Sequence, residues 1–467
     1  MPVVLINNLG GVNTYLNPLL DGQIIKSVNF DSFPLGGKTK RAGYSTYLGT
    51  ADGSTVTSLF NWTKNDGTTF FNYRASGSSL YYSAQGTGAW TLAGNGTITA
   101  GAHVGYAVLD DTLIIGDGAG STRHTTNGTS FTDTTLAPVS EFFAEFENRI
   151  YAAGTSSDLF FSTTNDATNW ETTGTSDSSS IVIPGAGKLG VIFKAADRLT
   201  ATKNSGIINR WDGASRVDLS TLVGPSSPYS VAQQEGFYVW LNRLGIYLYS
   251  GERPQIISNT IQRQFYNNSG SAIAGTAFDD APGEIHRYDY LVSVGTLTDD
   301  LTQETISNAI IKYDLQKNQF MNYEYADKPT AMLSYRDENG DKQFIFGDSS
   351  GQCYQTDPTV YNDNGEAINC ELQGFIHLGT LLDKKWNWFR ALMNPGNEAR
   401  MQIAITNTWT ARVKNWRDLG DVNDGVAEFR FPAGSRGKFL FWRVMESSKN
   451  STTSVYGFEI DAEIIPK

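Results

Sequence analysis

The chain has 467 residues, 40% of them hydrophobic and 12% aromatic, which excludes a mainly disordered protein and favours two or more domains. Its formal net charge of −12 argues against a general nucleic-acid binder that relies on neutralising phosphates. Two cysteines, Cys353 and Cys370, are too few for a disulfide framework, so we expect two thiols, with a single bridge as the open alternative.

Residues 1–55 are the first predicted unit, an extended N-terminal arm rich in asparagine, glycine and leucine. A buried extended segment needs partners for its backbone, so we expect the arm to pair along a sheet edge, in this subunit or in a neighbour. The first residues lack the basic segment and long apolar core of a signal peptide, and no apolar run approaches the roughly 20 residues of a membrane span. We therefore expect a soluble protein made in the cytoplasm.

Residues 56–360 repeat one plan, a short apolar or aromatic strand followed by a polar turn. The repeated strand recurs at Tyr82, His124, Phe161, Trp211, Tyr249, Tyr313 and Tyr354. Repetition at roughly 40 residues is typical of the blades of a β-propeller. The sequence therefore predicts an all-β protein with a propeller of about seven blades, whose irregular spacing indicates loop insertions.

Residues 361–467 break this rhythm and alternate apolar with polar positions, as in Met401–Thr406 and Val455–Ile465. Such alternation predicts an antiparallel β-sandwich as a C-terminal domain. Two basic and aromatic clusters lie here, 384–388 and 414–417, and they would suit stacking on a base or sugar, or a contact between subunits. We favour the subunit contact and assign it to Trp386, Trp388, Trp416 and Trp442.

Local motifs for catalysis or metal binding are weak. The segment Ser162–Trp170 resembles the Asp-box turn of sialidases, a device of the fold that lies away from the active site, although Ala167 stands where that pattern has glycine. The glycine run 115–120 lacks the lysine and helix of a phosphate-binding loop. The histidines lack zinc spacing and the acidic pairs lack a calcium-loop pattern, so we predict structural residues and solvated turns. They are His103, His124, His286, His377, Asp110-Asp111, Asp279-Asp280 and Asp299-Asp300.

A family resemblance enters with the arm, whose characteristic residues are Leu9, Gly10, Gly11, Asn17, Pro18, Gln23, Asn29, Gly36, Gly37, Lys40, Arg41 and Gly43. In type and spacing they resemble the opening of podoviral tail nozzle proteins, also called tail tubular protein B, and of the related packaged-DNA stabilisation hub. The ending, with Trp442 and then Gly457-Phe-Glu-Ile, looks similar as well. Two departures are that Leu9 abuts the glycine pair and that Ala42 stands where many relatives have proline.

The resemblance implies a virion protein rather than an enzyme, with no cofactor. Such a protein is assembled in the host cytoplasm into a homo-oligomeric ring, expected to be a hexamer, that continues the DNA-ejection channel and helps retain packaged DNA. Its implied partners are the tail adaptor, tail fibre or spike proteins, and passing DNA in transient contact. Acidic residues facing inward would keep phosphates from adhering to the channel wall. We assign assembly to the arm, at Leu9, Gly10, Gly11, Gln23, Asn29, Lys40 and Arg41, and expect a chain without residues 1–45 to fold but assemble poorly.

Two other classes stay open. A carbohydrate-active or carbohydrate-binding propeller of the sialidase or lectin kind is the main alternative, and as a sialidase it would need three converging arginines and a tyrosine–glutamate pair. The second is a cellular propeller that acts as a platform for protein interactions.

Overall fold

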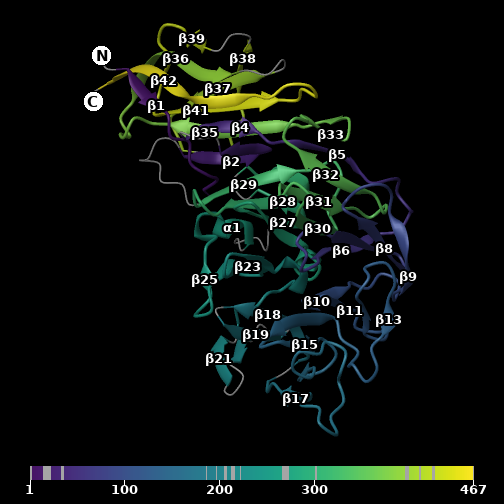
Figure 1. The fold of residues 1–467 in the computed structure, drawn as a ribbon. Helices are drawn as coiled ribbons and strands as arrows, with labels where there is room; N and C mark the ends of the chain where they lie inside the picture. Colours follow the sequence, from purple (N-terminus) through teal and green to yellow (C-terminus); the bar gives the residue numbers. More distant parts are fainter. Residues whose placement is uncertain are drawn as a thin grey trace.

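The computed structural model describes residues 3–13, 23–32, 36–185, 187–195, 197–203, 208–211, 216–220, 222–265, 273–299, 302–394, 399–409, 412–422 and 426–465. Strands dominate the described residues, whose helical elements include the 3-10 turns η2 (Pro228–Ser230), η3 (Asn259–Ile261) and η4 (Gly275–Phe278) and the short α1 (Gln262–Phe265). The prediction of an all-β propeller is confirmed (Figure 1). No helix in the described ranges is long and apolar enough to cross a membrane.

Six blades, rather than the seven predicted, consist of four consecutive antiparallel strands each. Blade one holds β6 (Val56–Thr63), β7 (Phe70–Ser76), β8 (Ser79–Ala84) and β9 (Thr91–Thr97). Blade two holds β10 (Gly105–Leu109), β11 (Thr112–Gly116), β12 (Arg123–Thr125) and β13 (Thr132–Asp133). Blade three holds β14 (Phe142–Phe146), β15 (Arg149–Ala153), β16 (Asp158–Phe161) and β17 (Ser179–Val182).

The remaining three blades follow in chain order. Blade four holds β18 (Leu189–Ala195), β19 (Arg198–Lys203), β20 (Ile208–Trp211) and β21 (Arg216–Ser220). Blade five holds β22 (Ala232–Gln234), β23 (Phe237–Asn242), β24 (Gly245–Tyr249) and β25 (Gln255–Ile256). Blade six holds β26 (Gly283–His286), β27 (Asp289–Thr298), β28 (Thr305–Asp314) and β29 (Gln319–Glu324). First strands of neighbouring blades contact one another, as β10 does β14, β14 does β18 and β22 does β26, so these strands lie towards the centre of the ring.

A composite sheet stands where the sequence predicted one more contiguous blade. The chain supplies only β30 (Ala331–Arg336), β31 (Lys342–Gly347) and β32 (Cys353–Asp357) in succession, and β5 (Gly43–Tyr47) from the arm is the fourth strand. The short β33 (Asn362–Asp363) and β34 (Glu366–Ala367) extend this sheet. The N-terminal segment therefore closes the propeller, which no local repeat within 56–360 could reveal.

Two facing sheets make the predicted C-terminal sandwich, at the top of Figure 1. One contains β35 (Cys370–Ile376), β41 (Phe439–Glu446), β37 (Arg400–Thr406) and β38 (Arg417–Asp421). The other contains β42 (Ser454–Ile464), β36 (Lys384–Asn394) and β39 (Val426–Arg430), with β1 (Val4–Ile6), β3 (Phe30–Ser32), β4 (Lys38–Lys40) and β40 (Arg436–Gly437). The rings of Trp442 and Phe458 pack against each other between the two sheets, with their centroids 4.3 Å apart.

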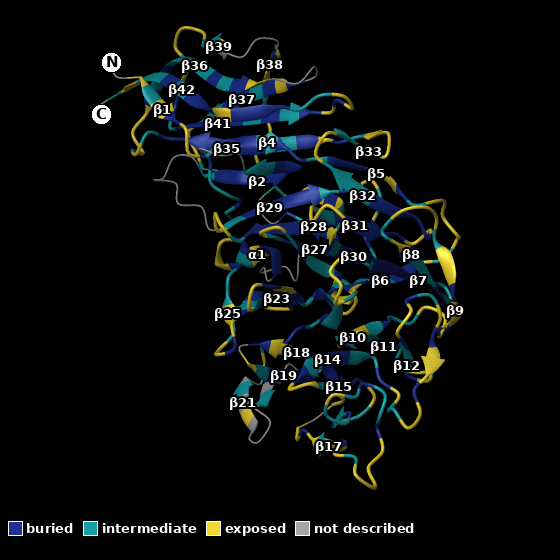
Figure 2. Cartoon of the chain, viewed as in Figure 1, coloured by how far each residue is buried: buried dark blue, intermediate teal, exposed yellow. Residues whose placement is uncertain are grey.

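The arm is the element that joins the propeller to the sandwich. Its strand β2 (Ile24–Val28) is buried throughout and lies between β29 of blade six and β35 of the sandwich. One nine-stranded sheet thus runs from the centre of the propeller to the far edge of the sandwich. One hydrophobic core likewise includes Val239 of blade five, Ile24 of the arm and Phe458 of the sandwich, and Figure 2 shows buried residues continuing across the junction.

The arm therefore pairs with sheets of its own subunit, as one of the two predicted options had it. Since β2 and β5 are interior strands, we now expect a chain without residues 1–45 to misfold, contrary to the expectation from sequence. Asn17 and Pro18, which belong to the resemblance, lie outside the described residues. Cys353 and Cys370 are both free thiols, buried in different hydrophobic cores.

Candidate functional site

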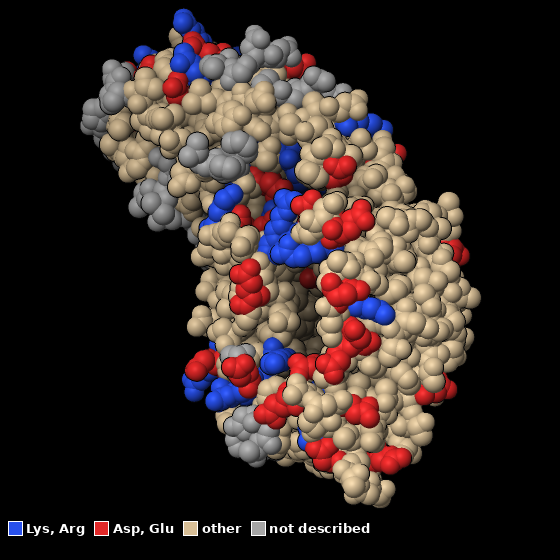
Figure 3. All heavy atoms as spheres, viewed as in Figure 1, with Lys and Arg blue, Asp and Glu red and all other residues tan. Residues whose placement is uncertain are grey.

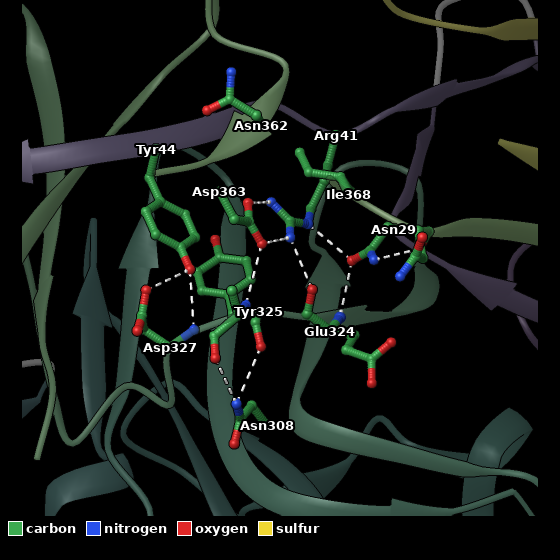
Figure 4. A network of polar contacts seen from close by, with 12 residues as sticks. Asn29, Arg41, Tyr44, Asn308, Glu324, Tyr325, Asp327, Asn362, Asp363 and Ile368 are labelled. Atoms are coloured by element: carbon green, nitrogen blue, oxygen red, sulfur yellow. Dashed lines mark hydrogen bonds and ion pairs between the residues drawn. The ribbon is translucent and has the colours of Figure 1, made fainter. Parts of the chain in front are cut away.

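Three cations of the arm, Lys26, Lys40 and Arg41, form ion pairs inside the subunit. The guanidinium of Arg41 donates to both carboxylate oxygens of Asp363, at 2.8 Å and 2.6 Å, and to the main-chain oxygen of Glu324 at 2.8 Å (Figure 4). Arg41 and Asp363 are almost fully buried, and the rings of Tyr325 and Tyr323 lie beside the guanidinium. Asp363 holds the pKa of Arg41 above its ordinary value in spite of burial, which by itself would lower it.

Asn29 orients this ion pair. Its side-chain oxygen accepts from Arg41 Nε and from the amide of Glu324, both at 2.8 Å, and its amide group donates to the Asn369 carbonyl at 2.7 Å. Its φ of 60° lies in the left-handed region, which asparagine tolerates better than most residues. The asparagine of the motif therefore fixes the arm at the point where propeller, arm and sandwich meet.

Neighbouring lysines extend the same pattern. Lys40 contacts the buried carboxylate of Glu446 at 3.2 Å, and Lys26 pairs with Glu371 at 2.7 Å and with Glu304. Lys38 differs because it is fully buried and its hydrogen-bond partners among the described residues, Ser32 and Gln319, are neutral, so burial lowers its pKa to about 7. Arm lysines thus tie β2 and β4 to the sandwich and to blade six.

The other arm residues assigned to assembly also lie against their own subunit. Leu9 is fully buried, and its amide donates to the Gly36 carbonyl at 2.8 Å. A Cβ on Gly11 would lie 2.8 Å from the amide of Phe320, so glycine permits the close approach of the arm to blade six. Gly10 and Gln23 line the same shallow depression beside Phe320, where Gln23 accepts a hydrogen bond from Asn13. A role of these residues in assembly stays a prediction.

The tryptophans of the sandwich divide into two pairs. Trp386 and Trp442 are each only 1% exposed and belong to the core between the sheets, which corrects their assignment to a subunit contact. Trp388 and Trp416 are half-buried and carry the guanidinium groups of Arg390 and Arg443 on their rings. These two remain available as contact residues.

A second polar site, which we call the axial site, lies where the innermost strands begin. It consists of His103, Tyr106, Glu141, Tyr229 and Asp280. These residues line two adjoining cavities of about 510 and 180 Å³, and His103 borders both. Figure 3 shows the propeller hollowed near the middle of the ring, with acidic side chains gathered around the opening.

Contacts within the axial site are tight. The Tyr229 hydroxyl donates to a Glu141 carboxylate oxygen at 2.5 Å, and the His103 ring stacks on Tyr229 with centroids 3.5 Å apart. Burial raises the pKa of Glu141 and lowers that of His103, so both groups are shifted towards their neutral forms. Burial raises the pKa of Glu284, on β26, to about 7.

The axial site meets only part of the chemistry of a sialidase. It contains a tyrosine–glutamate pair in Tyr229 and Glu141, but no arginine belongs to the described lining of either cavity. The Asp-box-like turn behaves as predicted, since Asp166 caps it by accepting from Thr168 and Trp170 packs in a hydrophobic core. This turn lies in blade three, outside the lining of both cavities.

The acidic pairs, the glycine run and the histidines noted in the sequence are mostly residues of turns or side chains held by hydrogen bonds. Asp111 and Asp299 accept backbone amides, and Asp117, in the glycine run, accepts those of Thr99, Ala119 and Gly120. His124 and His286 each contact a hydroxyl group, of Thr134 and Ser334. Among the described residues no group of three or more histidine, cysteine or acidic side chains is placed to hold a metal ion, and Asp300 lies outside them.

Sequence reasoning missed the axial site because its residues come from separate blades. Tyr106 follows the start of blade two, Glu141 precedes blade three, Tyr229 lies in η2 before blade five, and Asp280 precedes blade six. Each is an ordinary turn or strand residue in its local context. What these residues share is their position, just before or at the start of the first strand of a blade. This position can be recognised only when the first and last residues of each blade are known.

Comparisons with known proteins give structural likenesses at low sequence identity only. No protein-family description matches it, and no curated protein matches it. Among solved structures, it resembles the Neurospora crassa Pan2 WD40 domain at 10% identity and a TM-score of 0.43, over 68% of this chain and 96% of that one. It also resembles YCF48 from Cyanidioschyzon merolae, at 9% identity and a TM-score of 0.44 over 68% and 99% of the two chains. The computationally designed Ika8 protein matches at 11% identity and a TM-score of 0.39, over 67% and 99%.

Proposed function

We propose that this protein is a structural subunit of a bacteriophage tail, a nozzle or hub component. In this proposal, copies of the chain form a ring, a hexamer by the family resemblance, that continues the DNA-ejection channel below portal and adaptor and helps retain packaged DNA. The partners are the adaptor, tail fibre or spike proteins, and passing DNA. The protein acts in the virion as a non-enzymatic part.

The observation that supports this proposal is the position of the arm residues that carry the family resemblance. Asn29, Lys40 and Arg41 bind the propeller to the sandwich through buried polar contacts. Together with β2 in the nine-stranded sheet, these contacts join the two parts into one body. A subunit that transmits load along a tail needs such a rigid connection, because a flexible linker would let propeller and sandwich move independently.

The experiment is to measure the mass of the purified full chain by native mass spectrometry and to image the particles by electron microscopy. We expect a closed ring, since head-to-tail contacts close when the rotation between subunits divides a full turn. The double variant Trp388→Ala, Trp416→Ala should weaken the ring and leave the subunit folded. Tyr288→Ala, an exposed aromatic on a propeller turn, is the control and should assemble normally. A protein that stays monomeric both alone and with its adaptor would contradict the proposal.

A further inference from the structure

The larger cavity of the axial site, lined by blades six and one and by the composite sheet, has features of a built binding site. Strand β27 is irregular there, since its register against β28 shifts between Ser293 and Gly295 and again between Gly295 and Leu297. Asn308 on β28 has a φ of 46°, in the left-handed region. Bulges of this kind commonly lie beside functional sites, where they redirect side chains.

Polar groups without partners line this cavity. Ser293 is only 2% exposed, and its hydroxyl has no hydrogen-bond partner among the described residues. Asp280 and Lys328 are exposed on the lining, and within the described part of the chain neither forms an ion pair. Lys328 Nζ lies 3.4 Å from where a Cβ on Gly295 would be, so the ammonium group stands directly over the bulge. A buried hydroxyl without a hydrogen-bond partner destabilises the folded protein. A hydroxyl group of a bound ligand would supply that partner.

The smaller cavity adds an aromatic surface. Tyr106 is 39% exposed although it lies on an innermost strand, and Phe60 supports one face of its ring at a centroid distance of 4.7 Å. Tyr229, His103 and Glu141 also line this cavity, together with apolar residues that include Phe142, Phe143 and Ile192. A cavity of a few hundred Å³ that combines an aromatic face with a few convergent polar groups is typical of a small-molecule site.

We propose that the axial site binds a short glycan. The carboxylates of Asp280 and Glu141 accept hydrogen bonds from sugar hydroxyls. The Ser293 hydroxyl forms a further hydrogen bond with the sugar. The apolar face of a sugar ring packs on the ring of Tyr106. Lys328 discriminates between sugars, because its ammonium group pairs with the carboxylate of a uronic acid. The polar groups that line the larger cavity, among them Asp280, Ser293 and Lys328, favour a glycan over a peptide, because they can exchange hydrogen bonds with sugar hydroxyls. This site is independent of ring formation and adds a recognition function to the proposed structural one.

The test is calorimetric titration of the full chain with a panel of free tri- and tetrasaccharides, neutral and uronate-containing, extended to a glycan array. We expect saturable binding to at least one class. Asp280→Asn should weaken it about tenfold, the size expected when a charged hydrogen bond is lost. The matched control is Asp279→Asn, because Asp279 is the neighbouring residue, pairs with Arg243 and is not part of either cavity's lining. Tyr106→Ala should weaken binding several-fold, whereas Tyr288→Ala, an exposed tyrosine at the other end of β26, should not.

Lys328→Met separates the two sugar classes. It should abolish any preference for uronate-containing over neutral glycans and leave the affinity for neutral ones unchanged. The proposal is overturned if no glycan binds across the panel and array, if Asp280→Asn and Tyr106→Ala both bind like the parent chain, or if peptides bind in the axial site and glycans do not.

Discussion

At the scale of single residues, Arg41 and Asp363 form an ion pair in which both side chains are buried, as Lys40 and Glu446 do. Removing two charges from water is expensive, and their attraction offsets that cost only with good geometry and further hydrogen bonds. Asn29 and the Glu324 carbonyl supply such bonds. The pair therefore fixes where the arm lies more than it adds net stability.

We predict that Asp363→Asn lowers the free energy of unfolding by about 3–5 kcal/mol, because it leaves the guanidinium buried without a counter-charge. The control Asp279→Asn breaks an Arg–Asp contact of similar length, 2.7 Å, on the surface, where both side chains are more than half exposed. Such a pair contributes at most about 1 kcal/mol. Urea denaturation of both variants measures the difference, and equal losses would mean that the buried pair has no special role.

Glu284 makes a separate prediction about pH. Burial raises its pKa from 4.5 to about 7, so the folded protein keeps a proton that the unfolded chain has already released. Stability from this group is therefore highest at or below pH 4.5, falls as the pH rises towards 7, and is constant above. At about 1.4 kcal/mol per pKa unit, the loss is about 3 kcal/mol.

The variant Glu284→Gln removes this titration and keeps an oxygen that can accept the Ile285 amide. We expect it to be more stable than the parent chain at pH 8 and nearly equal at pH 4.5, as measured by denaturation at both values. A parent and variant that differ by the same amount at both pH values would show that Glu284 does not titrate in this range.

At the scale of elements, the arm is a set of strands rather than an appendage. Strand β2 is hydrogen-bonded on both sides, to β29 and β35, and β5 completes the composite sheet. A Cβ on Gly43 would lie 2.0 Å from the Asn362 carbonyl, so glycine is required where β5 passes β33. By contrast, β1 pairs with β42 alone among the described strands, and its residue Leu5 is exposed.

We predict that deleting residues 1–49 abolishes folding, since it exposes unpaired strand edges in both the propeller and the sandwich. Deleting residues 1–6 is the matched control, because it removes only the peripheral β1, and the product should stay folded with a slightly lower melting temperature. Circular dichroism and thermal melts of the two products test this. A folded product of the longer deletion would restore the view of the arm as a separate assembly element.

At the scale of the whole molecule, propeller, arm and sandwich share one sheet and one hydrophobic core. The three predicted units, 1–55, 56–360 and 361–467, are thus successive in sequence but interleaved in space. In a ring of such subunits, each subunit would be a rigid body. The contacts between subunits would be formed by surface residues. The half-buried Trp388 and Trp416 suit that role, and the buried Trp386 and Trp442 do not.

The sequence alone determined the all-β class, the propeller and the sandwich, because turn residues and alternating apolar positions act over a few neighbours and leave a local record. It also predicted the Asp-box-like turn around Asp166 and Trp170. Only the tertiary structure decided that β5 closes the propeller, that Arg41 meets Asp363, and that Tyr106, Glu141, Tyr229 and Asp280 share a site. These contacts join residues far apart in the chain, so they depend on how blades and sheets pack and leave no periodic signal in the sequence.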